Sequence, residues 1–219
     1  IKIGWRNLWR RRKRTLFTAS AMGLGMGLSL SIIALQSGIA SELFNEMVTD
    51  TLGHLQAHHP EYTEKRQLHM TIKGVEAQLS QLRADPGVSL ATSRIFSFAL
   101  AGGQERSTGA LITGVDPKSE ALISEMDREV KVGRWLSESA TQEVVLGVDL
   151  AQELSVKEGD ELALIGQDLY GGVANALYRV VGLVSSGSVE QDRAGVWIHL
   201  EDAQELLALD DQAHQLLII

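Results

Sequence analysis

Four histidines near the start of the chain are the first side chains whose type and spacing suggest a chemistry: His54, His58, His59 and His69. Neutral imidazole is a zinc ligand, and residues 54 and 58 would share one face of a strand. No acid–histidine helix motif accompanies them, and the same stretch offers Leu55 and Ala57 as core residues. The pattern therefore favours a solvated strand edge over a metal site, and we expect no bound metal.

Other catalytic patterns are weaker. The serines of residues 185–188 lack the G-x-S-x-G spacing of a hydrolase elbow and are better explained by a turn. Four carboxylates are better explained as caps of a short helix and a turn: Asp149, Glu153, Asp160 and Glu161. The chain has no cysteine, which excludes thiolate zinc sites and cysteine nucleophiles, and it has no G-x-x-x-x-G-K-[ST] phosphate loop. We therefore expect neither a cofactor nor nucleotide hydrolysis by this chain.

The charges are divided unevenly along the sequence. The 219 residues contain 20 basic and 28 acidic side chains, a net charge of −8. Seven of the basic residues lie in the first 14 positions, and no acid precedes Glu42, so the chain from Thr15 onward carries −15. An acidic body of this kind argues against a nucleic-acid-binding protein. The basic head and the acidic body are therefore two distinct parts of the chain.

An uncharged stretch follows the basic head. Residues 15–41 carry no charged side chain and would reach about 40 Å as a helix, enough to cross a bilayer. By the positive-inside rule the basic segment, residues 1–14, would stay cytoplasmic. The membrane-interface residues would be Trp5, Arg6, Trp9, Arg10, Arg11, Arg12, Lys13 and Arg14. A cleaved signal peptide and a buried soluble helix are the competing interpretations.

Two glycines suggest a role for this helix. Gly23 and Gly27 form a small-xxx-small pair that would let another membrane helix approach closely. Ordinary tolerance of glycine in membrane helices is an equally good explanation. The dinucleotide fingerprint G-x-G-x-x-G fails, because Leu28 occupies the position of the third glycine.

The rest of the chain has the pattern of an α+β domain. The helical spacing continues to about residue 50, so the span is predicted to run on into the outer domain. Short apolar runs separated by turns predict mixed strands and a few short helices, in two lobes of residues 52–115 and 116–219. Strands are predicted at 52–59, 88–100, 110–112, 144–146, 162–165, 177–184, 196–198 and 216–219, and helices at 72–82, 148–154 and 201–209.

Some apolar residues of this body could serve a partner and not the core. The set is Phe96, Phe98, Leu100, Leu169, Tyr170 and Val173. The glycine turn at 102–103 and the polar loop at 167–175 would present part of it to a lipid-modified or amphipathic client. Phe96, Phe98, Leu169 and Tyr170 are the predicted client or partner contacts.

These residues together resemble the permease family of MacB, LolC/LolE and FtsX, the mechanotransmitting ABC transporters. Residues 4–15 look like that family's opening, and residues 53–56 and 59–62 resemble the first outer strand of LolC/LolE-like members. Pieces matching the order of motifs in the family's periplasmic core domain continue to the end of the chain: 112–117, 133–136, 143–151, 156–160, 180–187 and 196–203.

The resemblance implies a transporter subunit in a bacterial inner membrane, with one span here and the bulk periplasmic. Partners would be a cytoplasmic ABC ATPase subunit, a second permease copy or paralogue, and a lipoprotein client or a periplasmic adaptor. The family has three more membrane helices after the outer domain, so this chain is expected to be the C-terminally incomplete front part of a permease.

Four functions are compatible with these expectations. Release of lipoproteins or lipids toward the outer membrane ranks first, and drug or peptide efflux with a periplasmic adaptor ranks second. A single-span anchored binding or sensor domain is the alternative of another class, and an anchored hydrolase is the least supported.

Overall fold

The computed structural model describes residues 12–47 and 55–219. By its internal contacts the chain divides into two units, Ile1–Met47 and Val48–Ile219. The first is built on one helix and the second is a mixed α/β body, so the α+β class predicted from the sequence is confirmed.

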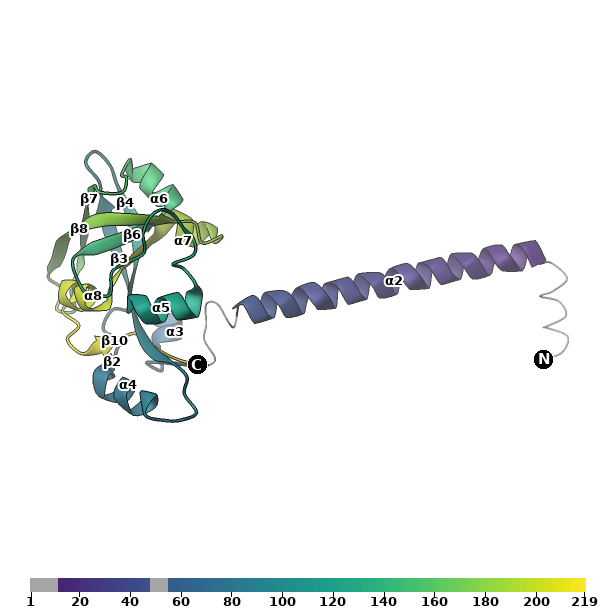
Figure 1. The fold of residues 1–219 in the computed structure, drawn as a ribbon, viewed down its shortest axis with the longest axis horizontal. Helices are drawn as coiled ribbons and strands as arrows, with labels where there is room; N and C mark the ends of the chain where they lie inside the picture. Colours follow the sequence, from purple (N-terminus) through teal and green to yellow (C-terminus); the bar gives the residue numbers. More distant parts are fainter. Residues whose placement is uncertain (1–11, 48–54) are drawn as a thin grey trace. The chain divides into compact units, whose positions relative to one another are not determined.

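Helix α2 runs without a break over Arg12–Met47, 36 residues or about 54 Å (Figure 1). The described side chains of residues 20–34 are all exposed. Ser29 and Ser31 donate their hydroxyl protons to the carbonyl oxygens of Gly25 and Gly27, both at 2.9 Å. Among the residues that the structure describes, no helix is both long and apolar enough to cross a membrane.

The body contains short strands and shorter helices. The strands are β1 Leu55–His58, β2 Ile72–Lys73, β3 Ala91–Gly102, β4 Ser107–Val115, β5 Val130–Gly133, β6 Glu143–Gly147, β7 Glu161–Gln167, β8 Val173–Val184, β9 Gly195–His199, β10 Gln212–Ala213 and β11 Gln215–Ile218. The helices are α3 Tyr62–Lys65, α4 Val75–Arg83, α5 Pro117–Ser124, α6 Val148–Leu154, α7 Val189–Ala194 and α8 Leu200–Leu207.

Six strands pair in a closed circuit. β3 pairs with β4, β4 with β9, β9 with β6, β6 with β8, β8 with β7, and β7 again with β3. The β4–β9 and β6–β8 pairs are parallel and the others antiparallel. Closure occurs because β3 and β8 are each 12 residues long, so each extends far enough to pair with β7 as well as with its other neighbours. Within the circuit these strands leave no open sheet edge.

The two ends of the body meet outside this circuit. β11 lies between β1 and the first residues of β3, and β10 pairs with β2. Figure 1 shows β2, β10 and α4 gathered at the same end of the body. The expected division into lobes at residues 115/116 is therefore corrected, because strands from both sides of that boundary alternate in one sheet.

The main core fills the inside of the circuit. Its strand residues include Ile95, Ile112, Leu164 and Ile198, and α6 and α8 supply the side chains that close it: Leu150, Leu154, Ala203, Leu206 and Leu207. A small barrel is typically filled in this way by the inward side chains of its own strands.

A second, smaller core lies on the outer side of part of the sheet. Met126 and Leu136 pack against Val145, Val181 and Trp197. Met126 follows α5 and Leu136 follows β5, so the segment that contains these two elements covers this part of the sheet. The indole N–H of Trp135 donates to the carbonyl of Pro117 at 3.2 Å and ties the segment to the start of α5.

A buried ion pair fixes α5 to β3. The guanidinium of Arg94 donates through Nε and Nη2 to the two carboxylate oxygens of Glu120, at 2.8 and 2.7 Å. The side chains are only 8% and 4% exposed. Because both charged groups are removed from water, replacing either one would leave the other buried without its counter-charge, which is strongly destabilising.

The predicted strands and helices are found with small shifts of their ends, and six short elements were not predicted: α3, β2, α5, β5, α7 and β10. One core prediction was wrong. Leu55 is 65% exposed and Ala57 is also exposed, because β1 is an edge strand that, among the described strands, pairs with β11 alone. The predicted helix at 72–82 begins later, at Val75, because Ile72 belongs to β2.

Candidate functional site: an exposed apolar sheet face

Residues facing outward on β3, β7 and β8 form a continuous apolar surface. Successive side chains of a strand point to opposite faces, so Phe98 and Leu100 point away from the core side of β3. Leu100 lies opposite Ile165 of β7, and Leu177 of β8 lies opposite Ala163 of β7. Val173 lies opposite Gln167 at the start of β8.

We call Phe98, Leu100, Ile165, Val173 and Leu177 the exposed apolar face. Their exposed fractions are 70%, 44%, 41%, 77% and 57%. The neighbouring outward positions on these strands hold Ala163, Gln167 and Asn175, none of which is charged. The face spans three strands about 4.8 Å apart and three rows, so it covers on the order of 300 Å². A patch of this size on a soluble domain is often an interaction site.

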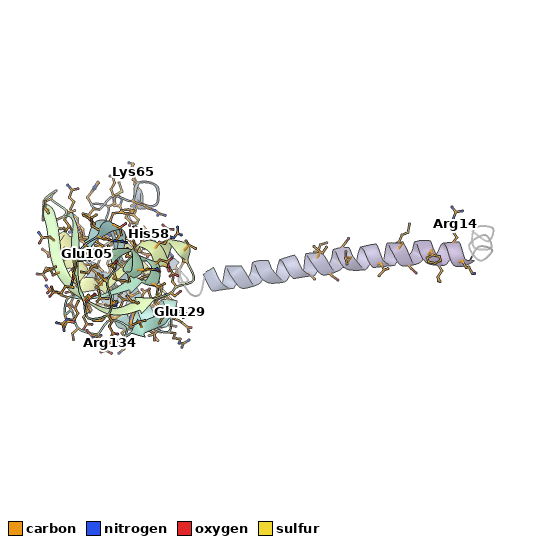
Figure 2. The ribbon with its side chains drawn as sticks, turned by 90° about the horizontal axis from the view of Figure 1, so that it is seen from above. Arg14, His58, Lys65, Glu105, Glu129 and Arg134 are labelled. Atoms are coloured by element: carbon orange, nitrogen blue, oxygen red, sulfur yellow. The ribbon has the colours of Figure 1, made fainter. Side chains whose placement is uncertain are left out.

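Charged residues lie only around this face. Glu161 and Arg179 lie opposite one another one row further along β7 and β8. Glu105, in the turn between β3 and β4 and labelled in Figure 2, lies at the same end of the face, because the last residue of β3, Gly102, is paired with Ala163. Nothing within the face can neutralise a buried charge, so it suits an apolar ligand with polar groups at its border.

The hairpin that joins β7 to β8 is held by its own carboxylate. Asp168 accepts hydrogen bonds from the backbone N–H groups of Tyr170 and Gly172, at 2.9 and 2.7 Å. Gly171 has a φ of +83°, which favours glycine. Tyr170 is 84% exposed at this tip, whereas Leu169 is half-buried and packs against the main core.

The structure thus separates the predicted contact residues. Phe98 and Tyr170 are exposed, and Phe98 belongs to the exposed apolar face. Phe96 is half-buried opposite Thr113 of β4, and Leu169 faces inward. Ile165 and Leu177 were missed, because only the pairing of β7 between β3 and β8 brings them beside Phe98 and Leu100.

The histidines occupy a different part of the body. His58 is stacked on Tyr62, with ring centroids 5.7 Å apart, and Tyr62 also contacts the ring of His214 at 5.1 Å. Burial raises the pKa of Tyr62 to about 12. His54 lies outside the described residues, and within the described ones no three His, Asp or Glu side chains are grouped as metal ligands.

His214 is fully buried and fixed by two backbone groups. Its Nδ1 accepts a hydrogen bond from the N–H of Phe96 at 3.1 Å, so Nε2 carries the proton and donates to the carbonyl of Leu68 at 3.0 Å. Burial lowers the pKa of His214, although the bond to Leu68 opposes this shift. The neutral imidazole therefore joins the segment after β1 to β3.

The remaining candidates have structural roles. Asp160 accepts the N–H of Lys157 at 2.8 Å within the turn before β7. Ser185 and Ser186 donate to the carboxylate of Asp192 at 3.2 and 2.8 Å, which orders the turn after β8.

The membrane-interface residues and the glycine pair belong to the first unit. Trp5, Arg6, Trp9, Arg10 and Arg11 lie outside the described residues. Arg12 begins α2, Lys13 and Arg14 are exposed, and Arg14 projects from the helix near its first turns (Figure 2). A Cβ at Gly23 or Gly27 would meet no other atom within 4 Å, so both positions are open.

Fold and surface together define a mixed α/β domain with an apolar sheet face that is partly exposed. The sequence matches, over residues 15–219, the family described as the MacB-like periplasmic core domain. The chain therefore belongs to the permease family of MacB, LolC and FtsX, and the bulk of it is an extracytoplasmic domain. The resemblance noted in the sequence is confirmed.

Individual relatives agree with this assignment. The lipoprotein-releasing system transmembrane protein LolC of Neisseria meningitidis serogroup B is 27% identical over 132 residues, which cover 58% of this chain and 32% of that protein. The chain thus spans about a third of the length of this curated relative.

Two solved structures share the fold. The extracellular domain of the noncanonic ABC-type transporter YknZ from Gram-positive bacteria superposes with a TM-score of 0.55 at 12% identity, covering 75% of this chain and 81% of that one. The periplasmic region of MacB from Actinobacillus actinomycetemcomitans gives 0.55 at 14% identity, covering 74% and 72%.

Proposed function

We propose that this chain belongs to a permease subunit of a mechanotransmitting ABC transporter that releases lipoproteins or lipids toward the outer membrane. The observation that carries the proposal is the family match over residues 15–219. The named activity of the LolC relative supports the choice of lipoproteins as clients. ATP hydrolysis would belong to a separate cytoplasmic subunit, and this chain would be its non-hydrolytic partner.

In this proposal residues 15–41 cross the inner membrane. The sequence supports this, because the stretch is uncharged, follows a basic segment and has its apolar residues distributed around the whole helix. The hydroxyls of Ser29 and Ser31 are bonded within the helix, which lowers the cost of placing them in lipid. Gly23 and Gly27 would contact another membrane helix.

The proposed mechanism is mechanical. ATP binding by the cytoplasmic subunit would displace the membrane helices, and α2 would carry that displacement outward because it has no break over 36 residues. A helix is stiff along its axis, so motion at its first turns reaches its last ones. The outer domain, with the exposed apolar face as its contact, would engage and release the client.

The topology can be tested directly because the chain has no cysteine. A cysteine replacing Lys2 and one replacing the exposed Ser139 should react with a membrane-impermeant maleimide from opposite sides of the membrane. Labelling of both from the same side in sealed vesicles would exclude the span. A cysteine replacing Ser29, inside the helix, is the control and should react from neither side.

The transporter assignment needs a second experiment. The full-length protein, purified in mild detergent, should bring down an ABC ATPase, and its depletion should stop ATP-dependent release of lipoproteins from spheroplasts. Recovery of the chain without an ATPase, with release unchanged after depletion, would favour the anchored binding or sensor domain.

A further inference from the structure

One half of the outer sheet surface is covered by the chain and the other half is not. On β6, β8 and β9 the outward apolar residues Val145, Val181 and Trp197 are covered by Met126 and Leu136 of the segment around α5. On β3, β7 and the first half of β8 the five residues of the exposed apolar face stay exposed at 41–77%. The described residues provide no element over this second half.

The two halves pose the same physical problem. A sheet with apolar side chains on a face is stabilised when another element packs on it and removes those side chains from water. The chain itself supplies such an element for the covered half. The same chemistry on the exposed half points to a cover supplied by another molecule.

We propose that the exposed apolar face binds a cationic amphipathic helix of a partner protein. This deepens the client or partner contact of the proposed function and rests on it. Apolar residues recurring at i, i+3, i+4 and i+7 of such a helix would lie over Phe98, Leu100, Ile165 and Leu177, as in other helix recognition by apolar surfaces.

Area and charge favour this ligand over the others. A stable interface between two proteins buries about 800 Å² on each, so a face on the order of 300 Å² is too small to hold a second copy by itself. An acyl chain is best sheltered by a concave pocket, whereas this face is the outer side of a sheet. The body described by residues 55–219 has 25 acidic and 13 basic side chains, a net charge of −12, which attracts a cationic partner.

The probe is an 18-residue peptide of leucine and lysine with its leucines at helical spacing, labelled with fluorescein. Its binding to the full chain in nanodiscs of zwitterionic phosphatidylcholine is followed by fluorescence anisotropy, with empty nanodiscs as the blank. We expect a scrambled peptide of the same composition to bind at least tenfold more weakly, because its leucines no longer share one face.

Variants locate the binding. F98S/L177S should weaken binding at least tenfold, and L100S/V173S should do the same, so a folding defect in one pair does not decide the result. The matched control is L122S, which removes a leucine of α5 that is 68% exposed but outside the face. It should leave binding within twofold.

Several results would overturn the proposal. They are equal binding of the scrambled peptide, unchanged binding by both double variants, and displacement of the peptide by a fluorescent fatty acid at lower concentration than by unlabelled peptide. Efficient disulfide cross-linking of two copies through Q167C would identify a second copy as the occupant instead. None of these depends on the recovery of an ATPase, so the proposed function can fail or survive separately.

Discussion

The buried pair of Arg94 and Glu120 gives a quantitative test of how α5 is held. Replacing Glu120 by leucine leaves the guanidinium of Arg94, 8% exposed, without the carboxylate that accepts two of its N–H groups. Removing one partner of a buried pair typically costs about 3–5 kcal/mol. We expect E120L to lower the free energy of unfolding by that amount.

The double replacement R94M/E120L should behave differently. Both charges are then gone, and apolar side chains of similar length occupy the space, which is often close to neutral for stability. We expect the double variant to unfold within about 1–2 kcal/mol of the parent. The difference from the single variant measures the coupling of the two side chains.

Urea unfolding followed by tryptophan fluorescence is a suitable assay. In a background with Trp5 and Trp9 replaced by phenylalanine, the remaining indoles are Trp135 and Trp197, and Trp135 is bonded to the first residue of α5. The signal therefore reports on the region under test.

An exposed pair in the same region is the matched control. Lys131 and Glu129 are 2.9 Å apart and about half exposed, so E129L should cost less than about 1 kcal/mol. The reasoning is refuted if E120L costs no more than E129L, or if R94M/E120L is as unstable as E120L.

Three further predictions concern the body. Because burial lowers the pKa of His214, the unfolded chain binds a proton below about pH 6.5 that the native imidazole does not bind. The contribution of His214 to the free energy of unfolding is therefore complete above about pH 6.5 and falls by up to about 1.4 kcal/mol per pH unit below it. H214Q should flatten this slope in unfolding curves between pH 7.5 and 5.5, and an unchanged slope would contradict the neutral, buried state of His214. Gly114→Ala should destabilise the body by about 2 kcal/mol or more, because the new Cβ would overlap a side chain of α8, whereas Gly109→Ala on the same strand has open space and should be nearly neutral in thermal unfolding. The hydrogen bonds from Arg134 lower the pKa of Glu143 to about 2, so the stabilisation by the ionised Glu143 is present above about pH 4.5 and is lost as the pH falls toward 2. Since Arg134 is more than half exposed, this loss should amount to less than about 1 kcal/mol of unfolding free energy, and E143Q should remove it. A larger change would show a stronger pair than the geometry allows.

The sequence was informative wherever the signal is local. The short helix over Val148–Leu154 and the strand around Val196 were predicted close to their observed bounds, because each combines an apolar run with a clear stop. The helix through Met47 was also predicted from spacing alone. Elements of four to eight residues with mixed polarity, such as α5 and β5, gave no periodic signal and were missed.

Features that depend on the pairing of strands from distant parts of the chain could not be predicted from local sequence patterns. The boundary at 115/116 follows the order of the chain, whereas β11 returns to lie between β1 and β3. Likewise the wrong assignment of Leu55 to the core came from alternation alone, which gives two faces of a strand but not which neighbour covers them.

The sequence by itself determined the division of charge, the mixed class of the body and the resemblance to the permease family, since all three are written in residue types and their order. Only the tertiary structure decided which apolar residues are left exposed. Phe98 and Leu177 are nearly eighty residues apart in the chain, and they share a face because β7 joins β3 to β8. Exposure is a property of what packs on a residue, and packing partners here come from distant parts of the chain.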